Sequence, residues 1–134
     1  MDNDEFIDSV ARRSGTSPEQ AEGLTRATLR TLAERIDGGE ARDLATQLPR
    51  ELRAYVFAPS ETGHRFGLDI FVQRVSGRAE VDGALARAGI CAVFDTLREA
   101  VTPGEYDDVI SQLPADLWEV TGSAARFDAQ RSRG

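Results

Sequence analysis

The sequence predicts an all-α fold, in which two tandem homologous helical units of about four helices each pack as one pseudo-twofold helical bundle. Two observations lead to this prediction. A phrase of eleven residues occurs twice, as GEARDLATQLP at residues 39–49 and as GEYDDVISQLP at residues 104–114. Around both copies, apolar residues recur at helical spacing between recognisable helix start and stop signals.

The repeat extends beyond the shared phrase, whose pattern is G-E-x-x-D-[LV]-x-x-Q-L-P. Residues 3–57 align without a gap on residues 68–122, at an offset of 65 residues and with 16 identities in 55 positions. Repetition on this scale indicates the duplication of one supersecondary unit. We therefore expect a first helical unit at 1–57, a linker at 58–67, a second unit at 68–122 and a flexible C-terminal tail at 123–134.

Each unit is predicted to hold two longer and two short helices. In the first unit, the first helix is expected at about residues 4–14, and Ser17 before Pro18 is typical of the start of the second helix. This second helix runs to about residue 36 and carries its apolar residues on one stripe, so we expect it at the edge of the bundle. Its counterpart at about residues 82–101 is apolar nearly all round, so we expect it at the centre with the first unit folded over it.

Gly89 lies inside that central helix, where glycine costs roughly 1 kcal/mol relative to alanine. Close packing of another helix over Gly89 would account for it.

The repeated phrase is predicted to start a short helix. Asp37 and Thr102 are capping residues, and each is followed three positions later by Glu, which is the capping-box arrangement. Each Glu also faces the positive end of the helix dipole. The proline that closes the phrase stops one helix and can begin the next. The residues assigned to this structural motif are Gly39, Glu40, Asp43, Gln47, Pro49, Gly104, Glu105, Asp108, Gln112 and Pro114.

Three phrases of each unit resemble a prokaryotic domain-of-unknown-function family of duplicated helical units. They are D-x-F-[ILV]-x-x-V, T-L-x-E before a loop, and the G-E-x-x-D-[LV]-x-x-Q-L-P signature. They stand at residues 4–10, 31–34 and 39–49, and again at residues 69–75, 96–99 and 104–114. The resemblance covers about residues 3–121 and implies an all-helical fold. It implies no activity, because the family has no established chemistry.

Composition argues against several classes of partner. The net charge is −7, whereas nucleic acids and anionic lipid surfaces require a basic face, so we expect neither as a partner. The only cysteine is Cys91, which excludes an intramolecular disulfide and fits a reducing cytoplasm. No apolar run approaches the roughly 20 residues of a membrane span, and the N-terminus is acidic where a signal peptide would be basic. We therefore expect a cytoplasmic protein.

Two pairs of carboxylates are the weak candidates for a metal site. Glu40 with Asp43, and Glu105 with Asp108, lie three residues apart and so share a helix face. Such pairs would bind a hard cation or act as acid and base. We favour helix capping and packing for them, and the sequence therefore predicts no metal, no cofactor and no catalytic residue.

His64 and Cys91 are the other reactive residue types. His64 lies in the polar linker, so we expect an exposed loop residue and not a metal ligand or part of a triad. Cys91 stands among Ile90, Ala92 and Val93, so we expect buried packing in preference to a nucleophile or a redox sensor.

Aromatic residues and repeated arginines offer two kinds of binding surface. Trp118 and Tyr55, with Phe57 close by, lie near the unit ends, where an exposed aromatic would anchor an interface and a buried one would close the core. Arg13 and Arg78 are repeat-equivalent. They would either clamp an anionic ligand at the pseudo-twofold axis or bridge a helix end to a neighbouring acid, and we favour the bridge.

The preferred function is a non-catalytic helical binding or scaffold module that acts through protein–protein contacts or self-association. The sequence contains no phosphate-cradling glycine loop, no clustered metal ligands and no nucleophile elbow. The alternative is a small-ligand sensor or an enzyme that uses a pocket between the two units, lined by the Glu/Asp pairs or by the two arginines.

Overall fold

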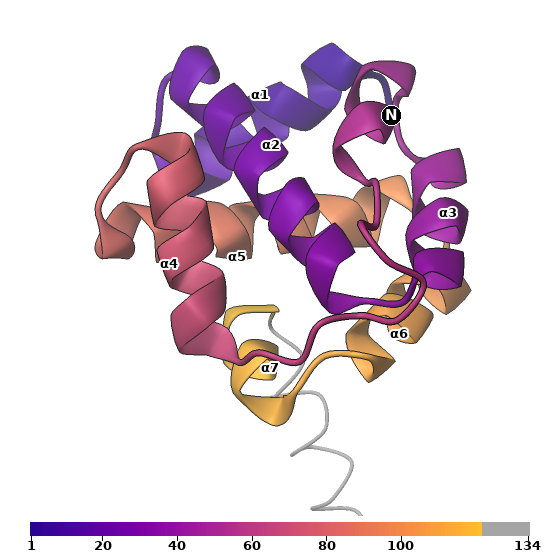
Figure 1. Ribbon diagram of the computed structural model, residues 1–134. Helices are drawn as coiled ribbons and strands as arrows, with labels where there is room; N and C mark the ends of the chain where they lie inside the picture. The colour runs from indigo at the N-terminus through magenta and orange to yellow at the C-terminus, as the bar shows by residue number, and fades with distance from the viewer. Residues whose placement is uncertain (122–134) are drawn as a thin grey trace, which may run out of the picture.

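The computed structural model describes residues 1–121, and these residues are helical without any strand, which confirms the all-α prediction (Figure 1). The elements are α1 (Asn3–Ser14), α2 (Pro18–Arg35), α3 (Gly38–Gln47), the 3-10 helix η1 (Arg50–Tyr55), α4 (Leu68–Ala79), α5 (Gly83–Ala100), α6 (Pro103–Ser111) and α7 (Ala115–Thr121). The predicted C-terminal tail, residues 123–134, lies outside the described residues. None of the helices in this range combines the length and the hydropathy that crossing a bilayer requires.

Five of the helices begin at a side-chain cap, as the sequence signals predict. In each case the side-chain oxygen of the N-cap residue accepts a hydrogen bond from the backbone N–H three positions later, which satisfies a donor that the helix cannot pair itself. The donor and acceptor pairs are Glu5 to Asp2, Gln20 to Ser17, Glu40 to Asp37, Leu85 to Asp82 and Glu105 to Thr102.

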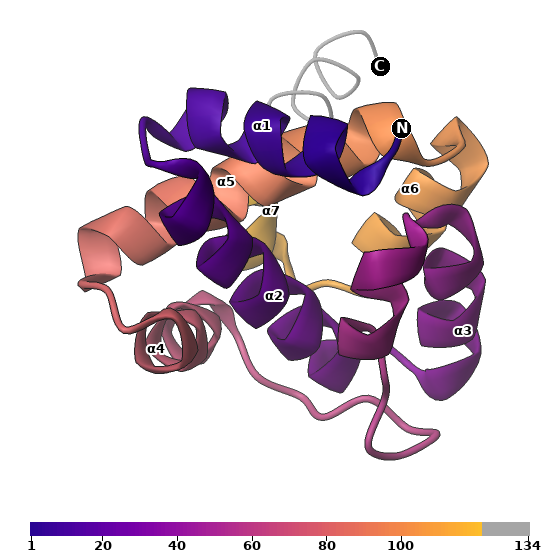
Figure 2. The ribbon, with the colours of Figure 1, turned by 90° about the horizontal axis from the view of Figure 1, so that it is seen from above.

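The helices pack crosswise between the two predicted units. Helix α1 packs against α5, and α2 packs against α4, while α2 and α5 also contact each other. Helices α3 and α6 pack together at the end of the molecule away from α4 (Figures 1 and 2). One hydrophobic core therefore draws residues from all eight elements, and it includes Phe6, Leu24, Leu52, Phe71 and Phe94.

Helix α5 lies at the centre, where it contacts α1, α2, α4, α6 and α7. A Cβ atom placed on Gly89 would lie 2.6 Å from Leu24 Cδ2 of α2, so another helix does pack closely over this glycine. The helix is not covered on every side, because Arg87 is exposed and Cys91 is only half-buried. The prediction that Cys91 is buried therefore holds only in part.

Helix α2 is not at the edge of the bundle, as its single apolar stripe predicted. It contacts α1, α4, α5 and η1, and three of its threonines, Thr25, Thr28 and Thr31, are fully buried. The hydroxyls of Thr25 and Thr31 donate to the carbonyls of Ala21 and Ala27, four residues earlier, at 2.7 and 2.8 Å. Buried threonines that satisfy their own hydroxyls widen the packed face beyond the apolar stripe.

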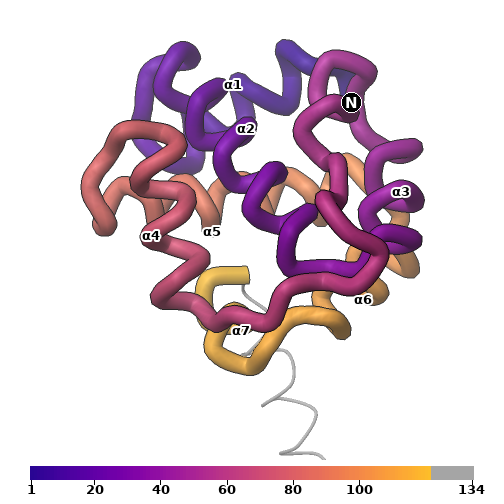
Figure 3. The backbone as a smooth tube through the Cα atoms, in the orientation of Figure 1, coloured from indigo at the N-terminus to yellow at the C-terminus, as the bar shows by residue number. Residues whose placement is uncertain are grey.

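The segment between η1 and α4 runs across the C-terminal end of α2 (Figure 3). The backbone N–H of His64 donates to the Glu34 carbonyl at 2.8 Å, and that of Gly38 donates to the Glu61 carbonyl at 2.9 Å. Gly63 is required here, because a Cβ atom at this position would lie 2.3 Å from the Arg35 carbonyl oxygen. Backbone hydrogen bonds therefore hold this segment against the end of α2 and the start of α3.

Candidate functional site

The glutamine of each copy of the signature binds the N-cap residue of the helix in the other copy, so the two glutamines link α3 and α6. The N–H of Thr102, the N-cap of α6, donates to Gln47 Oε1 at 2.7 Å. The N–H of Asp37, the N-cap of α3, donates to Gln112 Oε1 at 2.8 Å, and Gln112 Nε2 donates to Asp37 Oδ2 at 3.0 Å. Each glutamine thus supports the helix start of the other copy.

This arrangement corrects one part of the capping-box prediction. In a full capping box the Glu side chain reaches back to the N-cap N–H. Here that N–H is bound to a glutamine from the other copy, so the carboxylates of Glu40 and Glu105 are free to point elsewhere. The glycines and prolines of the motif do lie at helix boundaries: Gly39 and Gly104 are second residues of α3 and α6, Pro49 is the N-cap of η1, and Pro114 directly precedes α7.

Three of the four candidate carboxylates meet between α3 and α6. One oxygen each from Glu40, Asp43 and Glu105 lies within 4.8 Å of the other two, and we call this group the acidic cluster. Asp43 is exposed, Glu40 is half-buried, and Glu105 is buried with 7 % of its surface exposed. Asp108, the repeat-equivalent of Asp43, is exposed and is not a member of the cluster among the described residues.

The electrostatics of the acidic cluster are unfavourable for three ionised carboxylates. Burial, followed by the hydrogen bond and charge of Glu40, raises the pKa of Glu105 to about 8. Asp43 and Asp108 add to the same shift. Within residues 1–121, Glu105 Oε1 and Glu40 Oε2 are buried and accept no hydrogen bond while both carboxylates are ionised; a proton on Glu105 would allow it to donate to Glu40. A buried carboxylate in this condition requires a proton or a cation.

The repeat-equivalent arginines bridge helices, as the favoured prediction states. Arg13 Nη1 donates to Thr96 Oγ1 at 2.9 Å, and its guanidinium pairs with Glu99. Arg78 Nη1 donates to Thr31 Oγ1 at 2.8 Å, and Arg78 holds the Glu34 carboxylate with contacts of 2.6 and 2.9 Å. Both guanidinium groups are occupied by acids, which leaves little for an anionic ligand.

Other predicted residues fall at separate places. The side chain of His64 is exposed in the segment before α4, and it is not a member of the acidic cluster. Burial raises the pKa of the half-buried Cys91 thiol, which disfavours the reactive thiolate. Trp118 packs partly buried against the core, and its Nε1–H donates to the Ile110 carbonyl at 3.3 Å, so this aromatic closes the core.

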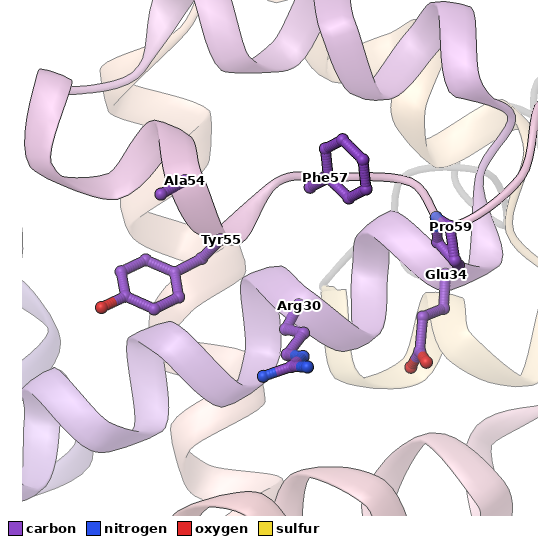
Figure 4. Close-up of a pocket in the computed structure, with 6 residues that line it drawn as sticks. All are labelled: Arg30, Glu34, Ala54, Tyr55, Phe57 and Pro59. Carbon is purple, nitrogen blue, oxygen red and sulfur yellow. The ribbon is translucent and has the colours of Figure 1, made fainter.

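A hollow of about 350 Å³ opens where the end of η1 and the following segment pass over α2 (Figure 4). Tyr55, Phe57 and Pro59 border it on one side, while Arg30 and Glu34 extend from α2 on the other (Figure 4). Phe57 is 77 % exposed, far more than any other aromatic residue of the described range. Of the three aromatics considered from the sequence, Phe57 is therefore the interface candidate.

A second hollow of about 280 Å³ adjoins the first and shares Arg30 and Tyr55 with it. We call the two together the Phe57 groove. Its lining residues are Gly23, Arg26, Ala27, Arg30, Glu34, Ala54, Tyr55, Phe57, Pro59 and Arg78. The lining contains three arginines and one glutamate, so the groove is locally positive although the chain has a net charge of −7.

The arginines of the groove are not equally occupied. Arg78 is held by Glu34, and Arg26 pairs with Glu22 while its guanidinium lies 5.3 Å from the centre of the Tyr55 ring. Arg30 is exposed and makes no hydrogen bond or ion pair with another residue of the described chain. The sequence does not single out Arg30, because it is one of several charged residues on a polar helix face.

Comparison with known proteins places the chain in a family without assigning an activity. A family model described as "Uncharacterized conserved protein (DUF2267)" matches residues 3–120, which is most of the chain. No curated protein matches the chain.

Proposed function

We propose that this chain, which belongs to the family of uncharacterized conserved proteins DUF2267, is a non-catalytic binding module that docks an acidic segment of a partner protein in the Phe57 groove. The observation that carries the proposal is Phe57, which is 77 % exposed and borders the same hollow as Arg30, whose guanidinium has no partner within residues 1–121. A large aromatic next to an arginine is the combination enriched at the energetic centres of protein interfaces.

Charge complementarity defines the segment that would fit. Glu34 and Glu22 are engaged by Arg78 and Arg26, so Arg30 is the cation of the groove that remains for a partner. Phe57, Tyr55 and Pro59 supply apolar surface next to it. The matching ligand presents an Asp or Glu side chain to Arg30 and an apolar side chain to the Phe57 ring.

The groove does not recur in the second half of the sequence. At the offset of 65 residues, Arg30 corresponds to Asp95 and Tyr55 corresponds to Val120. We interpret the chain as a duplicated unit whose repeated residues form a common pseudo-twofold framework. Two sets of matching contacts support this interpretation: Gln47 binds Thr102 as Gln112 binds Asp37, and Arg13 pairs with Glu99 as Arg78 pairs with Glu34. A surface that appears once on such a framework is a better candidate for recognition than the framework itself.

We also propose that the protein acts in the cytoplasm and that its partner is neither a nucleic acid nor a membrane. Its support is the net charge of −7 and the single cysteine. The alternative of a small-ligand sensor or an enzyme has one observation in its favour, the acidic cluster, whose chemistry is cation binding and which lies on other helices.

The test compares capture of host proteins by four forms of the tagged chain. Phe57→Ser and Arg30→Glu alter the groove, and Arg87→Glu alters an arginine on α5 that is also exposed. We expect one protein to be captured by wild type and by Arg87→Glu but not by the two groove variants, with unchanged melting temperatures. Affinity of the purified pair should fall at least tenfold in Phe57→Ser, since interface anchors contribute about 2 kcal/mol or more.

Two results would count against the proposal. Equal capture by all four forms would move the interface to another face. A chain that captures nothing and instead forms a dimer in sedimentation, lost on Phe57→Ser, would show that a second copy occupies the groove. Binding to a partner peptide should also weaken with added salt, since exposed charge pairs are screened.

A further inference from the structure

The acidic cluster raises a question that helix capping does not answer. Capping of α3 and α6 is carried by the side chains of Asp37 and Thr102 and by the two signature glutamines. The carboxylates of Glu40, Asp43 and Glu105 take no part in these bonds. They nevertheless converge between two helices that lie side by side (Figures 1 and 2).

The burial of Glu105 is the second, independent observation. Only 7 % of the Glu105 surface is exposed. Its Oε1 atom is shielded from solvent and accepts no hydrogen bond from another described residue. Glu40 Oε2 is in the same condition. No arginine within residues 1–121 pairs with either side chain. An unsatisfied buried carboxylate is costly, and a bound cation offsets that cost for all three carboxylates of the cluster, whereas a proton neutralises only one of them.

The spacing of the oxygens selects among possible cations. Calcium binds oxygen at roughly 2.3–2.6 Å, so oxygens on opposite sides of one calcium ion lie about 4.8 Å apart. Magnesium requires about 2.0–2.1 Å and near-octahedral geometry and keeps several of its waters, so three carboxylates held by two packed helices suit the more flexible shell of calcium better. The cluster has neither His nor Cys, the ligands that zinc prefers.

We propose that Glu40, Asp43 and Glu105 bind a divalent cation of calcium size, with water completing the coordination shell on the exposed side of Asp43. Two ligands come from α3 and one from α6, so the ion joins the two copies of the signature. This site is separate from the Phe57 groove, which lies on α2, η1 and the following segment.

The experiment titrates the chelator-treated full chain with calcium chloride, and in parallel with magnesium chloride, by calorimetry and by thermal melting at pH 8. We expect calcium to bind and to raise the melting temperature, and magnesium to bind at least tenfold more weakly. Glu105→Gln and Glu40→Gln should each weaken calcium binding at least tenfold. Asp108→Asn is the matched control, because it makes the same kind of change on α6 outside the cluster, and it should bind within about twofold of wild type.

The site is excluded if the wild-type chain shows neither calcium heat nor a calcium-dependent melting shift. It is excluded equally if Asp108→Asn loses as much affinity as Glu105→Gln, which would indicate non-specific charge screening. If Glu105→Gln does not fold, Glu40→Gln and Asp43→Asn decide, and calcium binding retained in both would overturn the proposal. Phe57→Ser should keep full calcium affinity, so failure of the groove and failure of this site can be told apart.

Discussion

Helices α2 and α5 occupy equivalent positions in residues 3–57 and 68–121, and they differ in side-chain size at the point where they cross. Leu24 of α2 and Gly89 of α5 correspond at the offset of 65 residues, and the Leu24 side chain fills the space that a larger residue at position 89 would need. Leu24 is fully buried and Gly89 is buried as well. The two halves are thus complementary where α2 meets α5, because the large Leu24 side chain packs against a residue that has no side chain.

The largest effects are expected from changing this complementarity. Leu24→Ala should lower the free energy of unfolding by about 2–5 kcal/mol, since it leaves a cavity. Gly89→Ala should lower it by about 1–3 kcal/mol, because the new methyl group overlaps Leu24. The double variant should be at least about 1 kcal/mol more stable than the sum of the two losses, because the methyl group then enters the cavity. Urea denaturation followed by circular dichroism measures all three.

Gly23→Ala is the control for helix propensity. A Cβ atom at Gly23 meets no other atom within 4 Å, so this change should stabilise α2 by up to about 1 kcal/mol. Strict additivity of Leu24→Ala and Gly89→Ala would mean that the two residues do not compete for one space.

The signature glutamines offer a second comparison. Among the described residues, Gln47 only accepts from the Thr102 N–H, whereas Gln112 both accepts from the Asp37 N–H and donates to the Asp37 carboxylate. Gln47→Glu keeps its acceptor next to the positive end of α6 and should stay within about 0.5 kcal/mol of wild type. Gln112→Glu places two carboxylates in contact and should cost about 1–2 kcal/mol in unfolding free energy.

The alanine variants show whether the glutamine bonds matter at all. Gln47→Ala and Gln112→Ala each leave a helix-start N–H without its partner and should each cost about 1 kcal/mol in chemical denaturation. Equal stability of Gln47→Glu and Gln112→Glu would contradict the unequal roles assigned to the two side chains.

The sequence predicted what depends on neighbouring residues and missed what depends on the meeting of distant ones. The caps at Asp2, Ser17 and Asp37 are local interactions, and the expected helices begin where these residues indicate. The edge position predicted for α2 is wrong, because Thr25 and Thr31, which lie outside the predicted apolar stripe, are buried as well.

The candidate sites follow the same division. The sequence paired Glu40 with Asp43 and Glu105 with Asp108, each along its own helix. The structure joins Glu105 to the first pair and leaves Asp108 out, because packing of α3 on α6 decides which carboxylates meet. Arg30 was missed for a related reason, since only the folded arrangement shows that no other residue within 1–121 pairs with it.

The bridge from Arg78 to Glu34 should make stability sensitive to acid. The hydrogen bond and charge of Arg78, with those of Arg74, lower the pKa of Glu34 below its ordinary value of 4.5. A lowered folded-state pKa contributes stability that is present above pH 4.5 and is lost as the pH falls through the folded value. The stability advantage of wild type over Glu34→Gln, about 0.5–1 kcal/mol at pH 7, should therefore shrink in acid denaturation series between pH 6 and pH 3.

Glu99, the repeat-equivalent of Glu34, pairs with Arg13 alone among the described residues, and its side chain is 52 % exposed, against 18 % for Glu34. Glu99→Gln should lose less stability than Glu34→Gln, because an exposed pair is better screened by water. The opposite order would show that the second arginine, Arg74, adds nothing to the Glu34 bridge.

The smallest expected effect concerns the ends of α1 and α4. Gly15 and Glu80 end these helices in the left-handed conformation, with φ of 69° and 57°, and each donates its N–H to the carbonyl four residues earlier. Glutamate pays for this conformation with roughly 1 kcal/mol of strain that glycine does not have. Glu80→Gly should therefore stabilise the protein by about 0.5 kcal/mol after the larger unfolded-state entropy of glycine is subtracted. Glu80→Ala should give no such gain in thermal melting, because alanine keeps the strain, and a gain in both variants would trace the effect to lost charge.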